Sequence, residues 1–216
     1  MIKMVVSDLD GTLLDKQNEL SEDVRNMLNE LKRNNILFTI ASGRKLCELI
    51  KLFHEFKDDI IFIACDGAYA TFKERVIVTE SIDSKILKRL TFPFEIISDK
   101  SGCAFKIIVN SNEISEREKE YIKNNHLLTL IYDDFGIKEY IKYGINKGTA
   151  LKQVLKTFNI DEKDVIAFGD NYNDKEMLKL ISRSYAVKNA KNDIKQICKY
   201  RTDDVCSTIM QFIERV

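Results

Sequence analysis

The sequence predicts an α/β protein whose core is a doubly wound, Rossmann-like parallel sheet, interrupted by a smaller inserted domain of α+β type. Apolar strand-like runs alternate with amphipathic helix-like segments over residues 1–67 and again after residue 144. Strands and helices that alternate in this way pair in parallel through right-handed crossovers. Between residues 68 and 143 the order changes to helix-strand-strand, twice over. We therefore expect a core domain at 1–67 and 144–216 and an inserted domain at 68–143, with hinges near Gly67 and Gly144.

The first part of the core contains three predicted strands. The first contains Val5 and Val6 and ends at a polar turn, and the others cover residues 36–41 and 60–64. Ser21 can cap the helix that follows the first strand. Apolar residues recur at helical spacing in both intervening helices, which predicts that each covers the sheet with one face. These residues are Val24, Met27, Leu28 and Leu31, and then Leu46, Leu49, Ile50 and Phe53.

The inserted segment begins with a predicted hairpin and continues as a small antiparallel sheet. The hairpin covers residues 69–79 and turns at 73–75. After it, short β-rich runs alternate with helical patterns, which predicts a separate α+β lobe. The predicted helices are 84–90 and 114–125, and the predicted strands are 94–98, 104–109, 128–132 and 137–143.

After residue 144 the alternation of helix and strand resumes. A helix is expected at 147–158, with Ala150, Leu151 and Val154 on its inner face. The strand that follows ends in a polar stretch, and the chain closes with alternating elements that complete the core sheet. The expected elements are a strand at 164–168, a helix to about 180, a strand at 184–187, and helices at 193–199 and 205–214.

The composition excludes several classes of protein. Lysine plus arginine and aspartate plus glutamate both total 34, and nucleic-acid-binding proteins usually carry a basic excess. No apolar run reaches the length of a membrane span, and the first residues lead into a strand rather than a signal peptide, so a cytoplasmic protein is expected. The five cysteines are scattered and form no Cys-x-x-Cys pair. They indicate small buried hydrophobes in a reducing compartment, and no zinc site.

Two carboxylates one residue apart end the first strand. Side chains alternate along a strand, so Asp8 and Asp10 share a direction. Neighbouring carboxylates repel, and one would stay protonated unless a cation lay between them. Hard oxygen ligands with no nearby His or Cys favour Mg²⁺, and Thr12 can fix the carboxylates through its hydroxyl. The alternative, which a single aspartate would favour, is that these side chains only cap a turn.

Two further segments have the features of phosphate ligands. The Ser42 hydroxyl and the backbone N–H groups of Gly43 and Arg44 lie where the second strand meets a helix, and can receive a phosphate oxygen. Ser-Gly before a helix is also a common cap. Lys147 lies in the first turn of its helix, where the helix dipole disfavours a cation and a bound anion would compensate. Because surface lysines are numerous, the alternative is a solvated side chain.

The last polar segment, residues 169–174, follows the strand at 164–168. Asp170 and Asp174 can complete an oxygen shell around Mg²⁺, and Asn173 can contact the substrate or orient the carboxylates. The alternative is a polar turn with an Asp cap. Because open α/β sheets bind ligands at the carboxyl ends of their strands, we expect all these segments to converge on one site.

Four segments, in this order, resemble the signatures of the haloacid dehalogenase superfamily, phosphatases and phosphotransferases that work through an aspartyl-phosphate. They are Asp8-Leu9-Asp10-Gly11-Thr12, Ala41-Ser42-Gly43-Arg44, Asn146-Lys147-Gly148-Thr149-Ala150-Leu151 and Gly169-Asp170-Asn171-Tyr172-Asn173-Asp174. The insertion between the second and third resembles the cap of the Cof-type branch, which includes sugar-phosphate and phosphoglycolate phosphatases. Two features depart from that branch: Asp66-Gly67-Ala68 stands where Asn-Gly-Ala is frequent, and the insertion is short, about 75 residues.

The resemblance implies a role for each matching residue. Asp8 attacks phosphorus and becomes an aspartyl-phosphate. Asp10 protonates the leaving group and later deprotonates water, while its backbone carbonyl joins Asp8, Asp170 and Asp174 as a ligand of Mg²⁺. Ser42 and Lys147 neutralise charge on the phosphoryl oxygens, and the cap excludes water and selects the leaving group. Gly43, Arg44 and Asn173 are carried over as substrate-binding residues.

The resulting hypothesis is a Mg²⁺-dependent phosphatase of small phosphorylated metabolites, with no nucleic-acid or membrane partner, acting as a monomer or homodimer. One alternative is a phosphotransferase such as a sugar-phosphate mutase. Another is a phosphate-responsive regulatory module without turnover, which the intact pair of Asp8 and Asp10 disfavours. The sequence does not select a substrate, because the strand parity that would orient cap residues such as Lys106, Lys138, Tyr140 and Lys142 is ambiguous.

Overall fold

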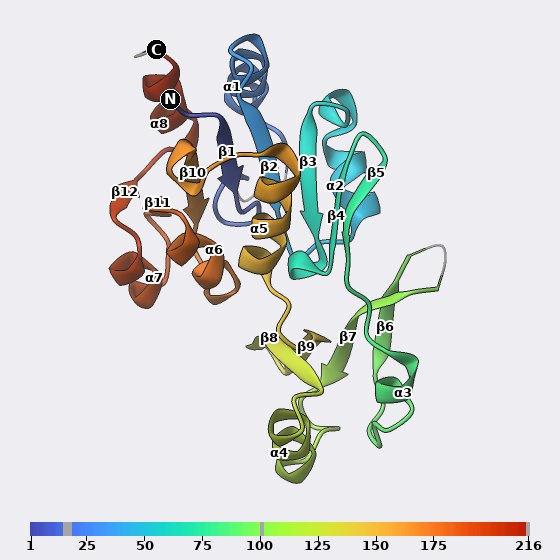
Figure 1. Cartoon of the computed structure of the whole chain (residues 1–216). Helices are drawn as coiled ribbons and strands as arrows, with labels where there is room; N and C mark the ends of the chain where they lie inside the picture. The colour runs from blue at the N-terminus through green and yellow to red at the C-terminus, as the bar shows by residue number, and fades with distance from the viewer. Residues whose placement is uncertain (15–18, 100–101, 215–216) are drawn as a thin grey trace.

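The computed structural model describes residues 1–14, 19–99 and 102–214. Figure 1 shows a large sheet with its helices in the upper part of the view and a smaller sheet with two helices below it. The two parts are joined by the chain on either side of the inserted segment. The α/β class and the inserted α+β unit that the sequence predicts are both present.

The large sheet contains eight strands in the order β12-β11-β10-β1-β2-β3-β4-β5. The first six in that order are parallel, and β4 and β5 are antiparallel to their neighbours. The parallel strands are β1 (Met4–Ser7), β2 (Leu37–Ala41), β3 (Ile60–Ala64), β10 (Val165–Gly169), β11 (Arg183–Val187) and β12 (Tyr200–Thr202). All residues of β1, β3 and β10 are buried, as expected for strands covered by helices on both faces.

The helices of the core follow from sequence patterns and caps. Helix α1 (Glu22–Arg33) begins at Ser21, whose Oγ accepts a hydrogen bond from the Val24 N–H, and it packs against α8. Helix α5 packs against α6, and α6 against α7. The remaining core helices are α2 (Leu46–Leu52), α5 (Lys147–Phe158), α6 (Lys175–Leu180), α7 (Asn192–Ile197) and α8 (Val205–Ile213). Short 3-10 turns cover His54–Phe56, Cys65–Gly67, Glu162–Asp164 and Tyr172–Asp174.

The hairpin of β4 (Tyr69–Phe72) and β5 (Arg75–Thr79) belongs to the large sheet. The order of elements in the sequence predicts this hairpin in the inserted domain, whereas the structure has it in the core sheet. The turn Cys65–Gly67 reverses the chain directly after β3, so that Ala70 pairs with Ile63 and is fully buried in the main core. We therefore propose that the inserted domain starts after Thr79 rather than at residue 68.

The inserted domain is a four-stranded antiparallel sheet in the order β6-β7-β9-β8. It has its own apolar core, which includes Ile107, Val109, Ile122 and Leu128. Its elements are α3 (Ser84–Leu87), β6 (Glu95–Ser98), β7 (Ala104–Asn110), α4 (Glu116–Asn124), β8 (Leu128–Asp134) and β9 (Ile137–Lys142). This agrees with the small antiparallel sheet that the sequence predicts.

Strand β12 is an element that the sequence analysis did not predict. It is three residues long and extends the large sheet next to β11. The rings of Tyr185 and Tyr200 stack across this pair, with 4.9 Å between their centroids, which fixes the edge strand in place. In the part of the chain that the structure describes, no helix has the length and apolar character needed to cross a bilayer.

Candidate active site

The strand register brings the polar segments together at one edge of the large sheet. Ser7 of β1 is level with Ile40 of β2 and Phe168 of β10. The residues that follow these strands, including Asp8 and Asp170, therefore lie side by side where the strands end. This is the edge at which open α/β sheets bind their ligands.

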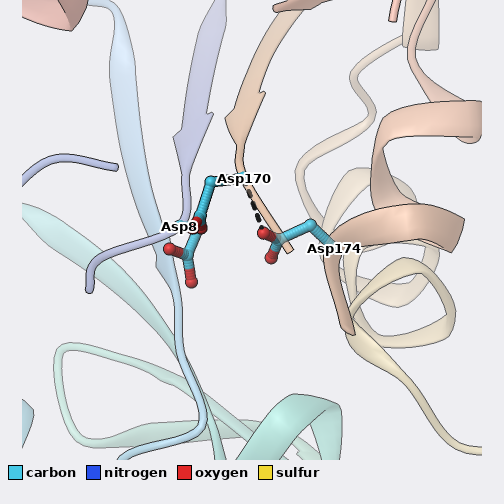
Figure 2. A group of neighbouring side chains, drawn as sticks. All are labelled: Asp8, Asp170 and Asp174. Carbon is cyan, nitrogen blue, oxygen red and sulfur yellow. Dashed lines mark hydrogen bonds between the residues drawn. The ribbon is translucent and has the colours of Figure 1, made fainter. Parts of the chain in front are cut away.

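Three carboxylates converge there, those of Asp8, Asp170 and Asp174 (Figure 2). One oxygen from each lies within 4.8 Å of the others. The Asp174 side chain is fully buried, and its Oδ2 accepts hydrogen bonds from the backbone N–H groups of Asp170 (3.0 Å) and Asn171 (3.1 Å). The 3-10 turn Tyr172–Asp174 thus folds Asp174 back toward the end of β10. Because β10 pairs with β1, Asp174 lies close to Asp8 although the two residues are far apart in the sequence.

Lys147 supplies a positive charge inside this group. Its Nζ donates to Asp8 Oδ1 at 2.6 Å and to Asp174 Oδ1 at 2.7 Å, and the side chain has no exposed surface. The capping box of Asn146 and Thr149 starts α5 at this point. A Cβ on Gly148 would lie 2.7 Å from the backbone of Glu176, so the glycine allows α5 and α6 the close approach that places Lys147 beneath the carboxylates.

The electrostatics of the group are dominated by burial. Burial raises the pKa of Asp8 well above its ordinary value, and the negative charge of Asp174 adds to this, while Lys147 opposes it. Burial and Asp174 likewise raise the pKa of Asp170. Burial would lower the pKa of Lys147, but the charges of Asp174 and Asp8 outweigh it and raise that pKa. The ammonium group of Lys147 contacts two of the three carboxylates, those of Asp8 and Asp174, and one positive charge does not compensate three carboxylates.

The same residues satisfy the requirements of a divalent cation. Asp8 Oδ2 is buried and has no hydrogen-bond partner among the described residues. A carboxylate oxygen left in this state costs free energy unless a further group meets it. An oxygen-only donor set of Asp8, Asp170 and Asp174 suits a hard cation such as Mg²⁺. The residues present thus fit the metal that the sequence predicts.

The turn after Asp8 supports Asp170. The Thr12 hydroxyl donates to Asp170 Oδ1 at 3.1 Å, in the orienting role that the sequence suggests for it. Gly11 has a φ of +83°, and a Cβ there would lie 3.0 Å from Asp170 Oδ2. A side chain at position 11 would therefore strain the backbone and crowd the carboxylate.

The Asp10 carboxylate lies outside the group of three. It is 46% exposed and forms a two-pronged ion pair with Arg44, in which Arg44 Nε donates to Asp10 Oδ2 at 2.9 Å and Nη2 donates to Oδ1. The hydrogen bond with Asp10 raises the pKa of the Arg44 guanidinium. The side chain that the family resemblance assigns to proton transfer is therefore held at the mouth of the site by a residue of the second signature.

Ser42 and Gly43, which follow β2, also line the site. Ser42 is buried, its backbone N–H donates to the Ile63 carbonyl at 2.9 Å, and its Oγ accepts from the Arg44 N–H at 3.1 Å. That hydrogen bond leaves the hydroxyl proton of Ser42 available for a phosphate oxygen. The Gly43 carbonyl faces the inserted domain, where it accepts a hydrogen bond from Lys106 at 3.1 Å.

Asn173 contacts Asp66 and not the group of three carboxylates. Its Nδ2 donates to Asp66 Oδ1 at 2.8 Å. The other oxygen, Asp66 Oδ2, lies 2.9 Å from Lys106 Nζ, which also lies 2.6 Å from Glu139 Oε2. The turn that carries Asp66 is strained, with φ values of 49° and 56° at Cys65 and Asp66. A chain of polar contacts thus runs from the fourth signature to the inserted domain.

These residues enclose a cavity of about 320 Å³ between the core and the inserted domain. Its floor is formed by the strand ends and its roof by β7, β8 and β9. The lining residues are Asp8, Asp10, Ser42, Gly43, Arg44, Asp66, Lys106, Ile131, Tyr132, Glu139, Asp170, Asn171 and Asn173. Lys147 and Asp174 lie behind this lining, in the wall.

Comparison with known proteins identifies the family. The family model described as haloacid dehalogenase-like hydrolase matches residues 5–96 and 92–213. The chain belongs to this family. The recognition of the superfamily and its Cof-type branch from the four signatures is therefore confirmed, and the chain is a hydrolase of this type.

Relatives and solved structures cover nearly the whole hydrolase. The 5-amino-6-(5-phospho-D-ribitylamino)uracil phosphatase YbjI of Escherichia coli (strain K12) is 25% identical over 244 residues, which cover 93% of this chain and 90% of the relative. The phosphoglycolate phosphatase of Picrophilus torridus is 26% identical over 211 residues, covering 93% and 85%. A crystal structure of a Streptococcus mutans UA159 protein has a TM-score of 0.84 at 22% identity and covers 99% of this chain and all of the other, which shows a shared fold.

Among the acidic residues that line the cavity of this hydrolase, the sequence did not assign two, Asp66 and Glu139. Asp66 had a usable signal, because a charged residue two positions after the end of the buried strand β3 lies near the same sheet edge as Asp8. Glu139 had none, because it lies on a short cap strand whose parity the sequence leaves ambiguous. Of the cap residues left open, the structure places Lys106 in the lining of the cavity.

Proposed function

We propose that this hydrolase is a Mg²⁺-dependent phosphatase that hydrolyses small phosphorylated metabolites through an aspartyl-phosphate on Asp8. The observation that carries the proposal is the state of the Asp8 carboxylate. Oδ1 is fixed by Lys147, while Oδ2 is buried without a partner among the described residues. One oxygen is thus anchored and the other is left for a bond to phosphorus or a metal.

In the first step, an oxygen of Asp8 forms a bond to phosphorus as the bond from phosphorus to the leaving oxygen breaks. Asp10 donates a proton to that leaving oxygen. For this step the Asp10 carboxyl has to leave its ion pair with Arg44 and contact the substrate instead. Ser42 donates a hydrogen bond to the phosphoryl group, and Lys147 holds positive charge beneath it. In the second step, Asp10 takes a proton from water, the water oxygen bonds to phosphorus, and the bond to Asp8 breaks to release phosphate.

Asp8, Asp170 and Asp174 would hold Mg²⁺, with the Asp10 backbone carbonyl as a further ligand. When bound, the cation supplies positive charge that offsets the negative charge of the phosphoryl oxygens in the transition state. Lys147 keeps Asp8 and Asp174 in place for this role, and Thr12 does the same for Asp170.

The relatives offer candidate substrates. Their names specify 5-amino-6-(5-phospho-D-ribitylamino)uracil and phosphoglycolate, both small phosphate monoesters. The five cysteines are free thiols, which favours a reducing compartment such as the cytoplasm as the place of work. We propose that a phosphate ester of this size is the partner that the enzyme requires for turnover besides Mg²⁺ and water.

Release of inorganic phosphate from p-nitrophenyl phosphate, with Mg²⁺ and with chelator, tests the proposal. We expect turnover only with Mg²⁺, and a drop in kcat of at least about 10⁴-fold in Asp8→Asn with unchanged circular dichroism. Asp10→Asn should slow both steps or accumulate phosphoenzyme. Asp203→Asn, an exposed aspartate between β12 and α8, serves as the control and should match the parent. Turnover in Asp8→Asn close to that of the parent would remove Asp8 from the role of nucleophile.

A further inference from the structure

Lys106 projects from the cap strand β7 into the seam between the two domains. Only 4% of the residue is exposed. Its Nζ lies 2.9 Å from Asp66 Oδ2, 2.6 Å from Glu139 Oε2 and 3.1 Å from the Gly43 carbonyl oxygen. An ammonium group has three N–H donors, and here three acceptors meet them. Lys106 therefore has no donor left for a substrate, although it lines the cavity.

The surroundings of Lys106 and Asp66 favour the charged form of both groups. Burial would lower the pKa of Lys106, but the charges of Asp66 and Glu139 outweigh it and raise that pKa. Burial would raise the pKa of Asp66, and the charges of Lys106 and Lys147 together with the hydrogen bond from Asn173 lower it instead. If Lys106 turned toward an anionic substrate, a buried carboxylate would lose its partner, which is strongly unfavourable.

Among the described residues, the other cation of the lining, Arg44, and the lysine behind it, Lys147, are matched as well. Arg44 pairs with Asp10, and Lys147 is enclosed between Asp8 and Asp174. On the side of the cavity that faces the cap, two carboxylates, Asp66 and Glu139, surround one ammonium group. This leaves one net negative charge where the leaving group of a phosphate ester would lie. The Glu139 side chain is 24% exposed and that of Asp66 is 4% exposed, so Glu139 presents this charge to the cavity.

We propose that Glu139, held in place by Lys106, makes the enzyme select phosphate esters whose leaving group is uncharged and donates hydrogen bonds, and reject esters with a second anionic group. This inference rests on the proposed phosphatase function and specifies its substrate class: of the two esters named by the relatives, it excludes phosphoglycolate, whose leaving group carries a carboxylate. A hydroxyl or amine of the leaving group donates to the Glu139 carboxylate. A carboxylate or second phosphate in the same position meets a like charge in a partly desolvated cavity, and Lys106, whose three donors are already engaged, does not compensate for it.

Two esters that differ in one group test the inference. Glycerol 3-phosphate carries a CH₂OH group where 3-phosphoglycerate carries a carboxylate. Both are measured as competitive inhibitors of p-nitrophenyl phosphate hydrolysis with Mg²⁺ present, so that the answer does not depend on their own turnover. We expect 3-phosphoglycerate to have an inhibition constant at least about tenfold higher than glycerol 3-phosphate.

The variant Glu139→Gln removes the charge and keeps the shape and a hydrogen-bond acceptor for Lys106. It should reduce the ratio of the two constants to within about threefold, chiefly by tighter binding of 3-phosphoglycerate. Glu116→Gln is the matched control, because this glutamate lies on cap helix α4 with 85% of its side chain exposed. It should leave the ratio unchanged.

Three results would overturn the inference: a parent enzyme that binds 3-phosphoglycerate at least as tightly as glycerol 3-phosphate, an unchanged ratio in Glu139→Gln, or no inhibition by either ester. Absence of p-nitrophenyl phosphate hydrolysis in the parent would instead contradict the proposed phosphatase. In that case the dissociation constants of the two esters are measured by titration calorimetry. The ratio of 3-phosphoglycerate to glycerol 3-phosphate is then compared between the parent and Glu139→Gln, with the same expected values.

Discussion

Replacement of Lys147 by methionine is expected to destabilise the protein strongly, since it removes the one cation that two buried carboxylates share. Lys147 Nζ lies 2.6 Å from Asp8 and 2.7 Å from Asp174, and none of its side chain reaches solvent. Removing one partner of a buried ion pair costs about 3–5 kcal/mol. For a domain of 150–250 residues this corresponds to a fall in Tm of about 6–20 °C. Methionine retains the length and packing of the side chain, so the loss reports on charge.

Thermal unfolding in the presence of chelator measures this loss, with Lys152→Met as the control. Lys152 is an exposed residue of the same helix, and its replacement should shift Tm by less than about 2 °C. In Lys147→Met the pKa of Asp8, already raised by burial, is expected to rise further. The folded state then binds a proton that the unfolded carboxyl, with its ordinary pKa of 3.8, does not bind at neutral pH. The deficit should therefore be smaller at pH 5 than at pH 8.

A Tm for Lys147→Met within about 2 °C of the parent at pH 8 would refute this reasoning. It would mean that Asp8 and Asp174 lose little when their shared cation is removed. A deficit that is larger at pH 5 than at pH 8 would equally contradict the assignment of the loss to uncompensated carboxylates.

Two further predictions concern the turn that carries Asp66. Gly67→Ala should lower the free energy of unfolding by about 2–4 kcal/mol, because the residue has a φ of +103° and its Cβ would lie 2.3 Å from the Asn146 carbonyl oxygen. Gly144 has a φ of +79° with open space around it, so Gly144→Ala should lower the free energy of unfolding by only about 1–2 kcal/mol. Equal losses for the two variants in chemical denaturation would contradict the steric argument. Lys106→Met should lower the free energy of unfolding by about 3 kcal/mol, and this deficit should be constant from about pH 5 to 9, because Asp66 keeps two groups that lower its pKa, the charge of Lys147 and the hydrogen bond from Asn173. The pKa of Asp66 is lowered in the folded protein, so its contribution to the free energy of unfolding is present above its ordinary pKa of 3.8 and is lost as the pH falls below that value. The pKa of Lys106 is raised in the folded protein, so its contribution is present below its ordinary pKa of 10.5 and is lost only as the pH rises beyond that value. A deficit that changes steadily between pH 5 and 9 would assign the stability to other groups.

The sequence was informative wherever a local pattern has one structural solution. The apolar run of β1 followed by Asp8 and Asp10 defines the end of a buried strand, and the spacing of Val24, Met27, Leu28 and Leu31 defines the buried face of α1. It was less informative where pairing decides the outcome. The hairpin of β4 and β5 has the same local pattern whether it joins the core sheet or the cap, and only its pairing with β3 places it in the core.

For the candidate site, the sequence indicated which residues meet but not how they pair. Asp8, Asp170, Asp174 and Lys147 were all candidates, since each follows a strand or begins a helix at the same sheet edge. Their contacts required the tertiary structure: Asp10 turns to Arg44, and Asn173 turns to Asp66 rather than to the carboxylates. Those choices depend on distances across segments that are remote in the sequence.

The sequence by itself determined the doubly wound core, the order of the four signature segments and the haloacid dehalogenase-like family. Hydrophobic periodicity and short motifs are local properties, and the register of parallel strands converts them directly into a shared edge. Only the tertiary structure decided that Lys106 and Glu139 of the cap meet Asp66 of the core. The charge of the cavity depends on which side chains pair across the domain seam, and no local pattern encodes a pairing between residues of different domains.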